Sequence, residues 1–173
     1  MADVGYTKPT NAIVVYGEPE VEFLKVETVA NCYPGRLVKK DTSDYQVEVC
    51  GAAGIAVGWL GYEQTEPSAR PDTVDTIYVV NKTVAVLHGG KFGIVALLKQ
   101  GENVVKGQLL VAAENGEVAA ADAITIAASG SDNITDGQGV VGTIPAGGLP
   151  VARALESVDA SSAAADIMVE SLI

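Results

Sequence analysis

Aromatic side chains and cysteines are scarce in this sequence. Phenylalanine, tryptophan and tyrosine make up 5% of the 173 residues, and there are two cysteines. Two cysteines cannot form the disulfide framework on which many small secreted domains depend. We interpret Cys32 and Cys50 as small buried hydrophobic side chains, because each lies in or beside a strand-like segment. A disulfide between them stays open as an alternative, although a chain of this length does not need one.

Basic residues are also scarce, and no long apolar segment is present. The 11 Lys and Arg residues face 22 Asp and Glu residues, which gives a formal charge of −11. Lys39-Lys40 is the only basic pair, whereas nucleic-acid binding requires a cationic face that releases counterions. No apolar run approaches the ~20 residues of a membrane span, and residues 1–15 do not resemble a signal peptide. We therefore expect synthesis in the cytoplasm and no direct contact with nucleic acid or a membrane.

Small residues dominate the apolar part of the sequence. Hydrophobic residues make up 48% of the chain, which also contains 19 glycines. Frequent valine and glycine favour many short strands whose backbones approach closely. A core of small side chains also favours an oligomer, because burial between subunits adds apolar area.

Short apolar or alternating runs, separated by glycine, proline and polar turns, recur along the chain. This pattern predicts an all-β fold, a compact β-barrel or sandwich of many short antiparallel strands. The glycines and prolines of residues 1–20 suit an extended N-terminal arm better than a packed element, and residues 21–173 then form a single β domain. We expect strands at residues 12–16, 21–31, 36–39, 45–50, 55–60, 74–80, 83–88, 92–98, 104–105, 108–112, 124–128, 151–156 and 166–173.

The segment from residue 89 to residue 122 consists of short strand-like runs joined by glycine turns. Its phrase Gly101-x-x-Val104-x-x-Gly107-Gln108-x-Leu110 resembles the half-motif of biotinyl and lipoyl carrier domains. Such domains carry their cofactor on a lysine at the tip of the following hairpin. The corresponding tip here is Glu114-Asn115-Gly116-Glu117, which contains no lysine. We therefore expect no cofactor, and we interpret Asn115-Gly116 as a hairpin turn in which both residues adopt positive φ.

No catalytic or metal-binding motif is complete in the sequence. His88 is the only histidine, and a catalytic role would require a positioned partner. The segment Asp132–Gly137 resembles a calcium loop, but Ile134 stands where an oxygen ligand is needed and Thr143 where a glutamate is needed. We expect no catalytic residue, no bound cofactor and no metal. A β-barrel hydrolase or lyase stays open as an alternative, and it would use the acidic residues of the long polar loop and its surroundings, Glu63, Glu66, Asp72 and Asp75.

Two segments and their order along the chain carry a resemblance to a known family. The first is Tyr33-Pro34-Gly35-Arg36-Leu37-Val38, and the second is residues 151–156, VARALE, followed by a small-residue turn and an alternating terminal strand. Together they resemble the decoration, or cement, proteins that coat the heads of tailed viruses of bacteria and archaea. The resemblance covers residues 30–173.

This resemblance implies a structural virion protein without a catalytic site. Such proteins are usually homotrimers on the outer surface of an icosahedral capsid, where they lock neighbouring capsomers. Many use an N-terminal arm to pair with the major capsid protein, by adding a strand to the edge of its sheet. The candidate capsid-contact residues of the arm are Tyr6, Lys8, Pro9, Ile13, Val15 and Tyr16. The alternative is a non-catalytic, carrier-like β-barrel subunit of a cytosolic enzyme complex.

Overall fold

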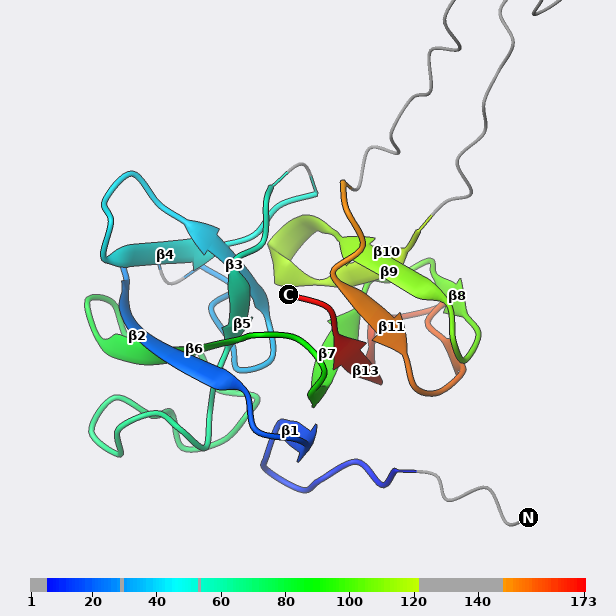
Figure 1. The fold of residues 1–173 in the computed structure, drawn as a ribbon, viewed down its shortest axis with the longest axis horizontal. Coiled ribbons are helices and arrows are strands. Elements are labelled where there is room, and N and C mark those ends of the chain that lie inside the picture. The colour runs from blue at the N-terminus through cyan, green and yellow to red at the C-terminus, as the bar shows by residue number, and fades with distance from the viewer. Residues whose placement is uncertain (1–5, 29, 53, 122–147) are drawn as a thin grey trace, which may run out of the picture.

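Two groups of strands make up the protein (Figure 1), seen in a computed structural model that describes residues 6–28, 30–52, 54–121 and 148–173. The strands are β1 (Val14–Tyr16), β2 (Glu20–Val26), β3 (Leu37–Lys40), β4 (Gln46–Val49), β5 (Gly58–Leu60), β6 (Thr83–His88), β7 (Gly93–Leu98), β8 (Asn103–Val104), β9 (Leu109–Ala112), β10 (Val118–Ala120), β11 (Ala152–Ala154), β12 (Val158–Asp159) and β13 (Ala165–Ser171). A 3-10 turn, η1 (Glu114–Gly116), lies between β9 and β10. The all-β fold expected from the sequence is confirmed.

The first group is a closed barrel with the strand order β2-β4-β3-β5-β6. Its strands pair in antiparallel fashion, except β2 with β4, which are parallel. Side chains alternate along β2, so that Leu24 and Val26 enter the barrel while Phe23 and Lys25 remain exposed. This alternation follows from the two-residue period of a strand with one buried face.

The second group is a six-stranded sheet with the order β1-β7-β10-β9-β11-β13, in which β13 also pairs with β7. The pairing of β13 with β7 closes five strands, β7, β10, β9, β11 and β13, into a ring. Strand β1 pairs with this ring along β7. The pairing of β10 with β7 is parallel. A short antiparallel pair, β8 with β12, lies beside this ring.

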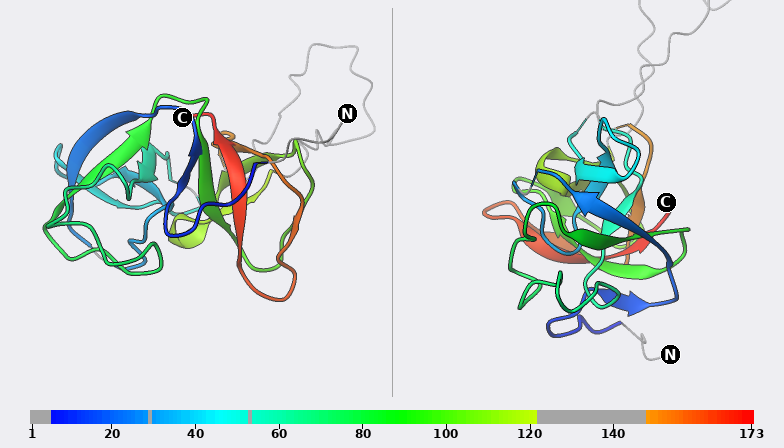
Figure 2. Two further views of the ribbon diagram at one scale, coloured as in Figure 1. Left: turned by 90° about the horizontal axis from the view of Figure 1, so that it is seen from below. Right: turned by 90° about the vertical axis from the view of Figure 1, so that its left-hand side faces the viewer.

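One hydrophobic core joins the two groups, which lie side by side (Figure 2). Strand β6 contributes to both sides: Val84 and Val86 point into the first barrel, whereas Ala85 and Leu87 belong to the shared core. The Trp59 indole Nε1 donates a hydrogen bond of 3.0 Å to Ser171 Oγ, with both residues fully buried. A buried indole N–H needs such a partner. The first barrel and the last strand are therefore tied together through their interiors.

The strand expected at residues 74–80 is wrong. These residues form turns and irregular backbone, in which Ile77 and Val79 are exposed and only Tyr78 is deeply buried. The Tyr78 hydroxyl donates to the carbonyl oxygen of Gly61, and its backbone N–H donates to the Cys32 carbonyl oxygen over 2.9 Å. Through these two hydrogen bonds, Tyr78 holds the segment against the first barrel without strand pairing. The strand expected at residues 124–128 lies outside the described residues.

Several local expectations are confirmed. Asn115 and Gly116 both have positive φ, of 58° and 69°, in the turn between the antiparallel strands β9 and β10. Cys32 and Cys50 are buried and free, so the disulfide alternative does not hold. Among the described residues, no helix is long and apolar enough to cross a membrane.

Candidate functional site

The N-terminal segment, residues 6–17, packs against the second group of strands. Val14 and Tyr16 in β1 pair with Ile94 and Gly93 in β7. Ile13 is only 2% exposed and belongs to the shared core. The unpacked N-terminal arm expected from the composition is therefore corrected for residues 6–17. Insertion of the Ile13 side chain into the core is the physical reason, because it removes a large apolar surface from water.

A single carboxylate holds the backbone of this segment. Glu63 Oε1 accepts hydrogen bonds from the backbone N–H groups of Ile13, over 2.5 Å, and Val14, over 3.1 Å. The other oxygen, Oε2, is buried and has no hydrogen-bond partner within the described ranges. The N–H groups of Ile13 and Val14 therefore already have an acceptor in Glu63. They are not available for hydrogen bonds to a strand of a partner protein.

Two stacked tyrosines mark the outer side of the segment. The Tyr6 and Tyr16 rings lie 4.5 Å apart at an interplanar angle of 22°. The Tyr16 ring covers Gly93, where an added Cβ would lie 2.4 Å from the ring. The Tyr16 hydroxyl donates to Glu170 Oε1 over 3.3 Å. Burial, and then the negative charge of Glu170, raise the pKa of Tyr16 from 10.0 to about 12, so its hydroxyl keeps its proton in the alkaline range above pH 10.

Polar side chains fix the segment at two further points. Lys8 forms an ion pair of 3.1 Å with Glu156 and donates to the backbone carbonyl of Asp166. Asn11 donates to the Tyr62 hydroxyl over 3.2 Å and accepts from the Val74 N–H over 3.0 Å. The segment is therefore held to the body by charged and neutral hydrogen bonds as well as by Ile13.

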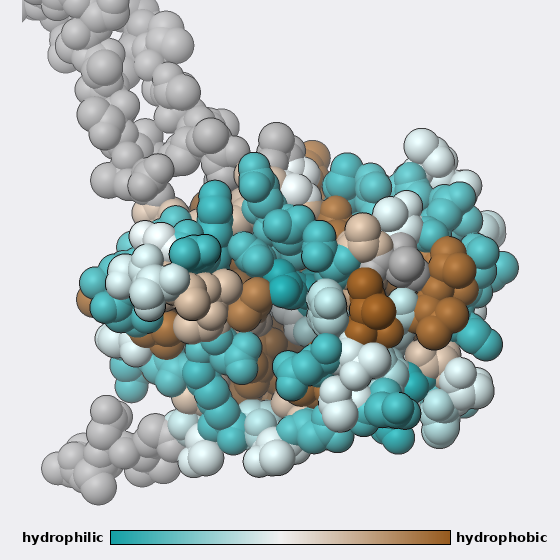
Figure 3. Space-filling view, turned by 180° about the vertical axis from the view of Figure 1, so that it is seen from behind, coloured by the Kyte–Doolittle hydropathy of each residue, from teal (hydrophilic) through white to brown (hydrophobic). Residues whose placement is uncertain are grey.

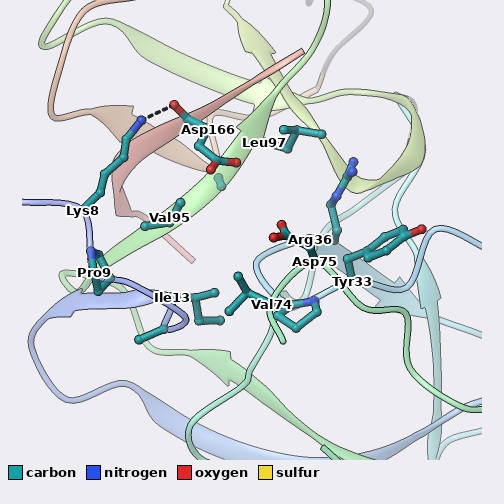
Figure 4. A pocket seen from close by; sticks show the side chains of 13 residues that line it. Lys8, Pro9, Ile13, Tyr33, Arg36, Val74, Asp75, Val95, Leu97 and Asp166 are labelled. Atoms are coloured by element: carbon teal, nitrogen blue, oxygen red, sulfur yellow. Dashed lines mark hydrogen bonds between the residues drawn. The ribbon is translucent and has the colours of Figure 1, made fainter. Parts of the chain in front are cut away.

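A cavity of about 280 Å³ lies between this segment, β7, the 33–36 turn and residues 74–75 (Figure 4). Its apolar walls include Ile13, Val74, Val95 and Leu97. The turn predicted at Pro34-Gly35 forms one side. There Gly35 has a φ of 77°, and a Cβ would lie 2.4 Å from the Val95 carbonyl oxygen. Only glycine permits this close approach, which places the turn against β7.

Four charged residues line the same cavity, namely Lys8, Arg36, Asp75 and Asp166. Arg36 forms an ion pair of 3.2 Å with Glu117 and a hydrogen bond of 3.0 Å to the Asn115 carbonyl oxygen. Its guanidinium also lies 5.7 Å from the centre of the Tyr33 ring. Arg36 is therefore committed to contacts within the protein.

The structure separates the six candidate contact residues into three groups. Lys8, Pro9 and Ile13 line the cavity. Tyr6 and Tyr16 form the ring stack, and Val15 is a half-buried residue of β1. The sequence reasoning missed Arg36 and Asp166 as neighbours of this segment. No signal in the sequence links residues so far apart, because the pairing of β7 with β13 brings Asp166 to the segment and the close approach of the 33–36 turn to β7 brings Arg36 there.

The carrier-like tip is packed rather than free. The Gly116 N–H donates to the Cys50 carbonyl oxygen over 2.8 Å, and the Asn115 side chain accepts from Asn31 over 2.8 Å. A Cβ at Gly116 would lie 2.7 Å from the Leu37 carbonyl oxygen. The turn that would carry a cofactor in a carrier domain is thus held against the first barrel.

The remaining chemical candidates do not form a catalytic constellation. His88 Nδ1 lies 3.6 Å from Glu20 Oε2, a carboxylate that is mostly exposed. Of the acidic residues in the hydrolase alternative, Glu63 binds the N-terminal segment and only Asp75 lines the cavity. Within the described part of the chain, no group of three or more His, Cys, Asp or Glu residues could hold a metal ion. The calcium-loop segment, residues 132–137, lies outside the described residues.

No model of a known protein family matches the sequence, and no curated protein matches it.

Proposed function

We propose that this protein is a non-catalytic structural component of a virion. In this role it binds the outer surface of an icosahedral capsid through the major capsid protein and stabilises contacts between capsomers. It acts as a homotrimer, uses no cofactor and contacts neither nucleic acid nor a membrane. The starting point is the resemblance of residues 33–38 and 151–156 to the corresponding segments of capsid decoration proteins.

One structural observation carries the proposal further. Lys8, Pro9 and Ile13, which the sequence indicates as candidate capsid-contact residues, line a surface cavity. Tyr6, two residues before Lys8, is half exposed and stacks on the Tyr16 ring. Tyrosine is enriched among the residues that contribute most to protein interfaces. Because the segment is already packed, we propose contact through the accessible side chains of Tyr6, Lys8 and Pro9 rather than through strand addition by a free arm.

The rest of the surface also suits contacts with other chains. Phe23, Ile55 and Val79 are 53%, 85% and 61% exposed. Brown apolar side chains also appear among hydrophilic ones on the face seen in Figure 3. A small acidic protein that leaves such large apolar side chains in water is suited to burying them against other subunits or a shell.

The carrier-like alternative receives less support. A swinging cofactor needs an accessible lysine on a free turn, and the turn at Asn115-Gly116 offers neither. We therefore place the capsid role first.

The proposal is tested with empty shells assembled from the major capsid protein encoded in the same genome. Wild-type protein should sediment with the shells, and Tyr6→Ala should bind about thirtyfold more weakly, because a central interface aromatic contributes about 2 kcal/mol or more. Tyr45→Ala, which removes an exposed tyrosine far along the chain, is the matched control. Light scattering of the free protein should give three times the mass of one chain.

Each outcome separates a different part of the proposal. Failure of the wild-type protein to sediment with the shells would contradict capsid binding. If Tyr6→Ala binds the shells with full affinity, only the proposed role of the N-terminal segment is contradicted. A strict monomer in solution would contradict the trimer.

A further inference from the structure

The cavity at the N-terminal segment has a charge pattern that specifies its occupant. We propose that it receives an arginine side chain of the partner protein, with the guanidinium bound between Asp75 and Asp166 (Figure 4). The inference deepens the proposed function and rests on it for the identity of the partner. The recognition itself follows from the residues that line the cavity.

The two cations of the cavity are already neutralised. Lys8 pairs with Glu156 over 3.1 Å, and Arg36 pairs with Glu117 over 3.2 Å. The carboxylates of Asp75 and Asp166 are exposed, and neither has an ion-pair partner within the described ranges. Two unpaired negative charges therefore remain, on a protein whose formal charge is −11. A cationic ligand is favoured over a neutral or anionic one.

The apolar walls of the cavity favour a ligand with a hydrocarbon stem. Ile13 is buried, and Val74, Val95 and Leu97 are half-buried along the cavity. A volume of about 280 Å³ falls just below the range of cavities that hold drug-sized molecules. It suits one long side chain whose methylene stem packs on the apolar walls while its charged head reaches the carboxylates.

The position of the carboxylates favours arginine among cationic side chains. Asp75 comes from the segment before β6, and Asp166 from β13, so they approach the cavity from different elements. A planar guanidinium presents donors in several directions and can bind both carboxylates at once, whereas the ammonium group of lysine acts as a point charge. A metal ion is a poorer fit, because no third His, Cys, Asp or Glu completes a ligand group among the described residues.

The probe is the peptide acetyl-Gly-Arg-Gly-amide, titrated into ¹⁵N-labelled full-length protein and followed by NMR. We expect saturable shifts at the amides of Val95, Ala96, Leu97 and Asp166, which line the cavity. The peptide with citrulline in place of arginine has nearly the same shape without the charge. It should bind at least about tenfold more weakly, because hydrogen bonds to charged groups are the strong ones. The lysine peptide should bind less tightly than the arginine peptide.

Paired variants test whether the arginine peptide binds through the carboxylates of Asp75 and Asp166. Asp75→Asn with Asp166→Asn keeps the side-chain size and should weaken binding of the arginine peptide about tenfold or more. Asp44→Asn with Asp72→Asn removes the same charge from exposed sites that do not line the cavity and should change the affinity little. An unchanged ¹⁵N spectrum away from the cavity shows that each variant is folded.

Three results would overturn the inference: equal binding of the citrulline peptide, equal weakening by the control pair, or shifts that map away from the cavity. The same variants mixed with shells separate this inference from the proposed function. If the Asp75 and Asp166 pair loses the peptide but keeps full affinity for shells, the cavity does not receive the capsid's arginine and capsid binding stands. If the wild-type protein binds the peptide but not the shells, capsid binding is contradicted and the arginine site stands.

Discussion

Glu63 binds the backbone of Ile13, whose N–H lies 2.5 Å from Glu63 Oε1, and the same oxygen also accepts from Val14. This contact connects the N-terminal segment to the loop that follows β5. Because it satisfies two backbone donors at once, this side chain contributes to the position of the segment beside the β1–β7 pairing and the burial of Ile13. The stability of the segment can therefore be tested by single substitutions.

Replacing Glu63 should loosen the N-terminal segment. We expect Glu63→Ala to lower the free energy of unfolding by about 1–3 kcal/mol, because two backbone N–H groups lose their acceptor. Hydrogen exchange of the Ile13 and Val14 amides should become faster. Glu66→Ala, an exposed site in the same loop, should change stability by less than about 0.5 kcal/mol. Unchanged exchange at Ile13 in the Glu63 variant would contradict this role.

Adding one methyl group beneath the Tyr16 ring should also be destabilising. In Gly93→Ala the new Cβ would lie 2.4 Å from the ring, so the ring has to move and the stack with Tyr6 is disturbed. Overpacking of this kind costs about 1–3 kcal/mol. Gly51→Ala is the control, since nothing lies within 4 Å of its Cβ. Urea unfolding measures both variants, and equal stability of the two would show that the ring is not held as described.

Alkaline pH should destabilise the protein partly through Tyr78. Burial raises the pKa of Tyr78 from 10.0 to about 12. Between these values the unfolded chain has lost the phenolic proton while the folded protein retains it, so the contribution is full below pH 10 and is lost as the pH rises towards 12. Tyr78→Phe should be less stable at pH 8, because its hydroxyl no longer binds Gly61, yet it should lose less stability between pH 10 and 12. Urea midpoints across this range measure the difference, and parallel curves for variant and wild type would refute the assignment.

The two thiols should be unreactive in the folded protein. Burial raises the pKa of Cys32 to about 12 and also raises that of Cys50, and both side chains are fully buried. Since the thiolate is the reactive form, a thiol reagent should label neither cysteine under native conditions and both in denaturant. Rapid labelling of Cys32 in the folded protein would show that the first barrel opens or is packed differently, and rapid labelling of Cys50 would show the same for the shared core.

The sequence predicts those elements whose pattern is local. Strands at residues 83–88 and 166–173 follow from apolar runs, and the turn at Asn115-Gly116 follows from residues that tolerate positive φ. Residues 74–80 have the same β-branched composition but no strand partner, because Tyr78 alone is anchored. Pairing depends on what lies across the fold, and no local pattern records it.

The candidate site shows the same limit more clearly. Lys8 and Ile13 could be selected from the sequence because the segment that holds them has an unusual composition. That Ile13 would enter the core, or that Asp75 and Asp166 would share a cavity with it, depends on long-range pairing of β1 and β13 with β7. The packed segment replaces the free arm that composition alone indicated.

Electron cryomicroscopy of empty shells mixed with excess protein tests the central claim most directly. The account predicts added density on the outer surface of the shell, repeated by the shell's symmetry and large enough for the two groups of strands in each copy. Shells that show no added outer density at saturating protein would contradict it.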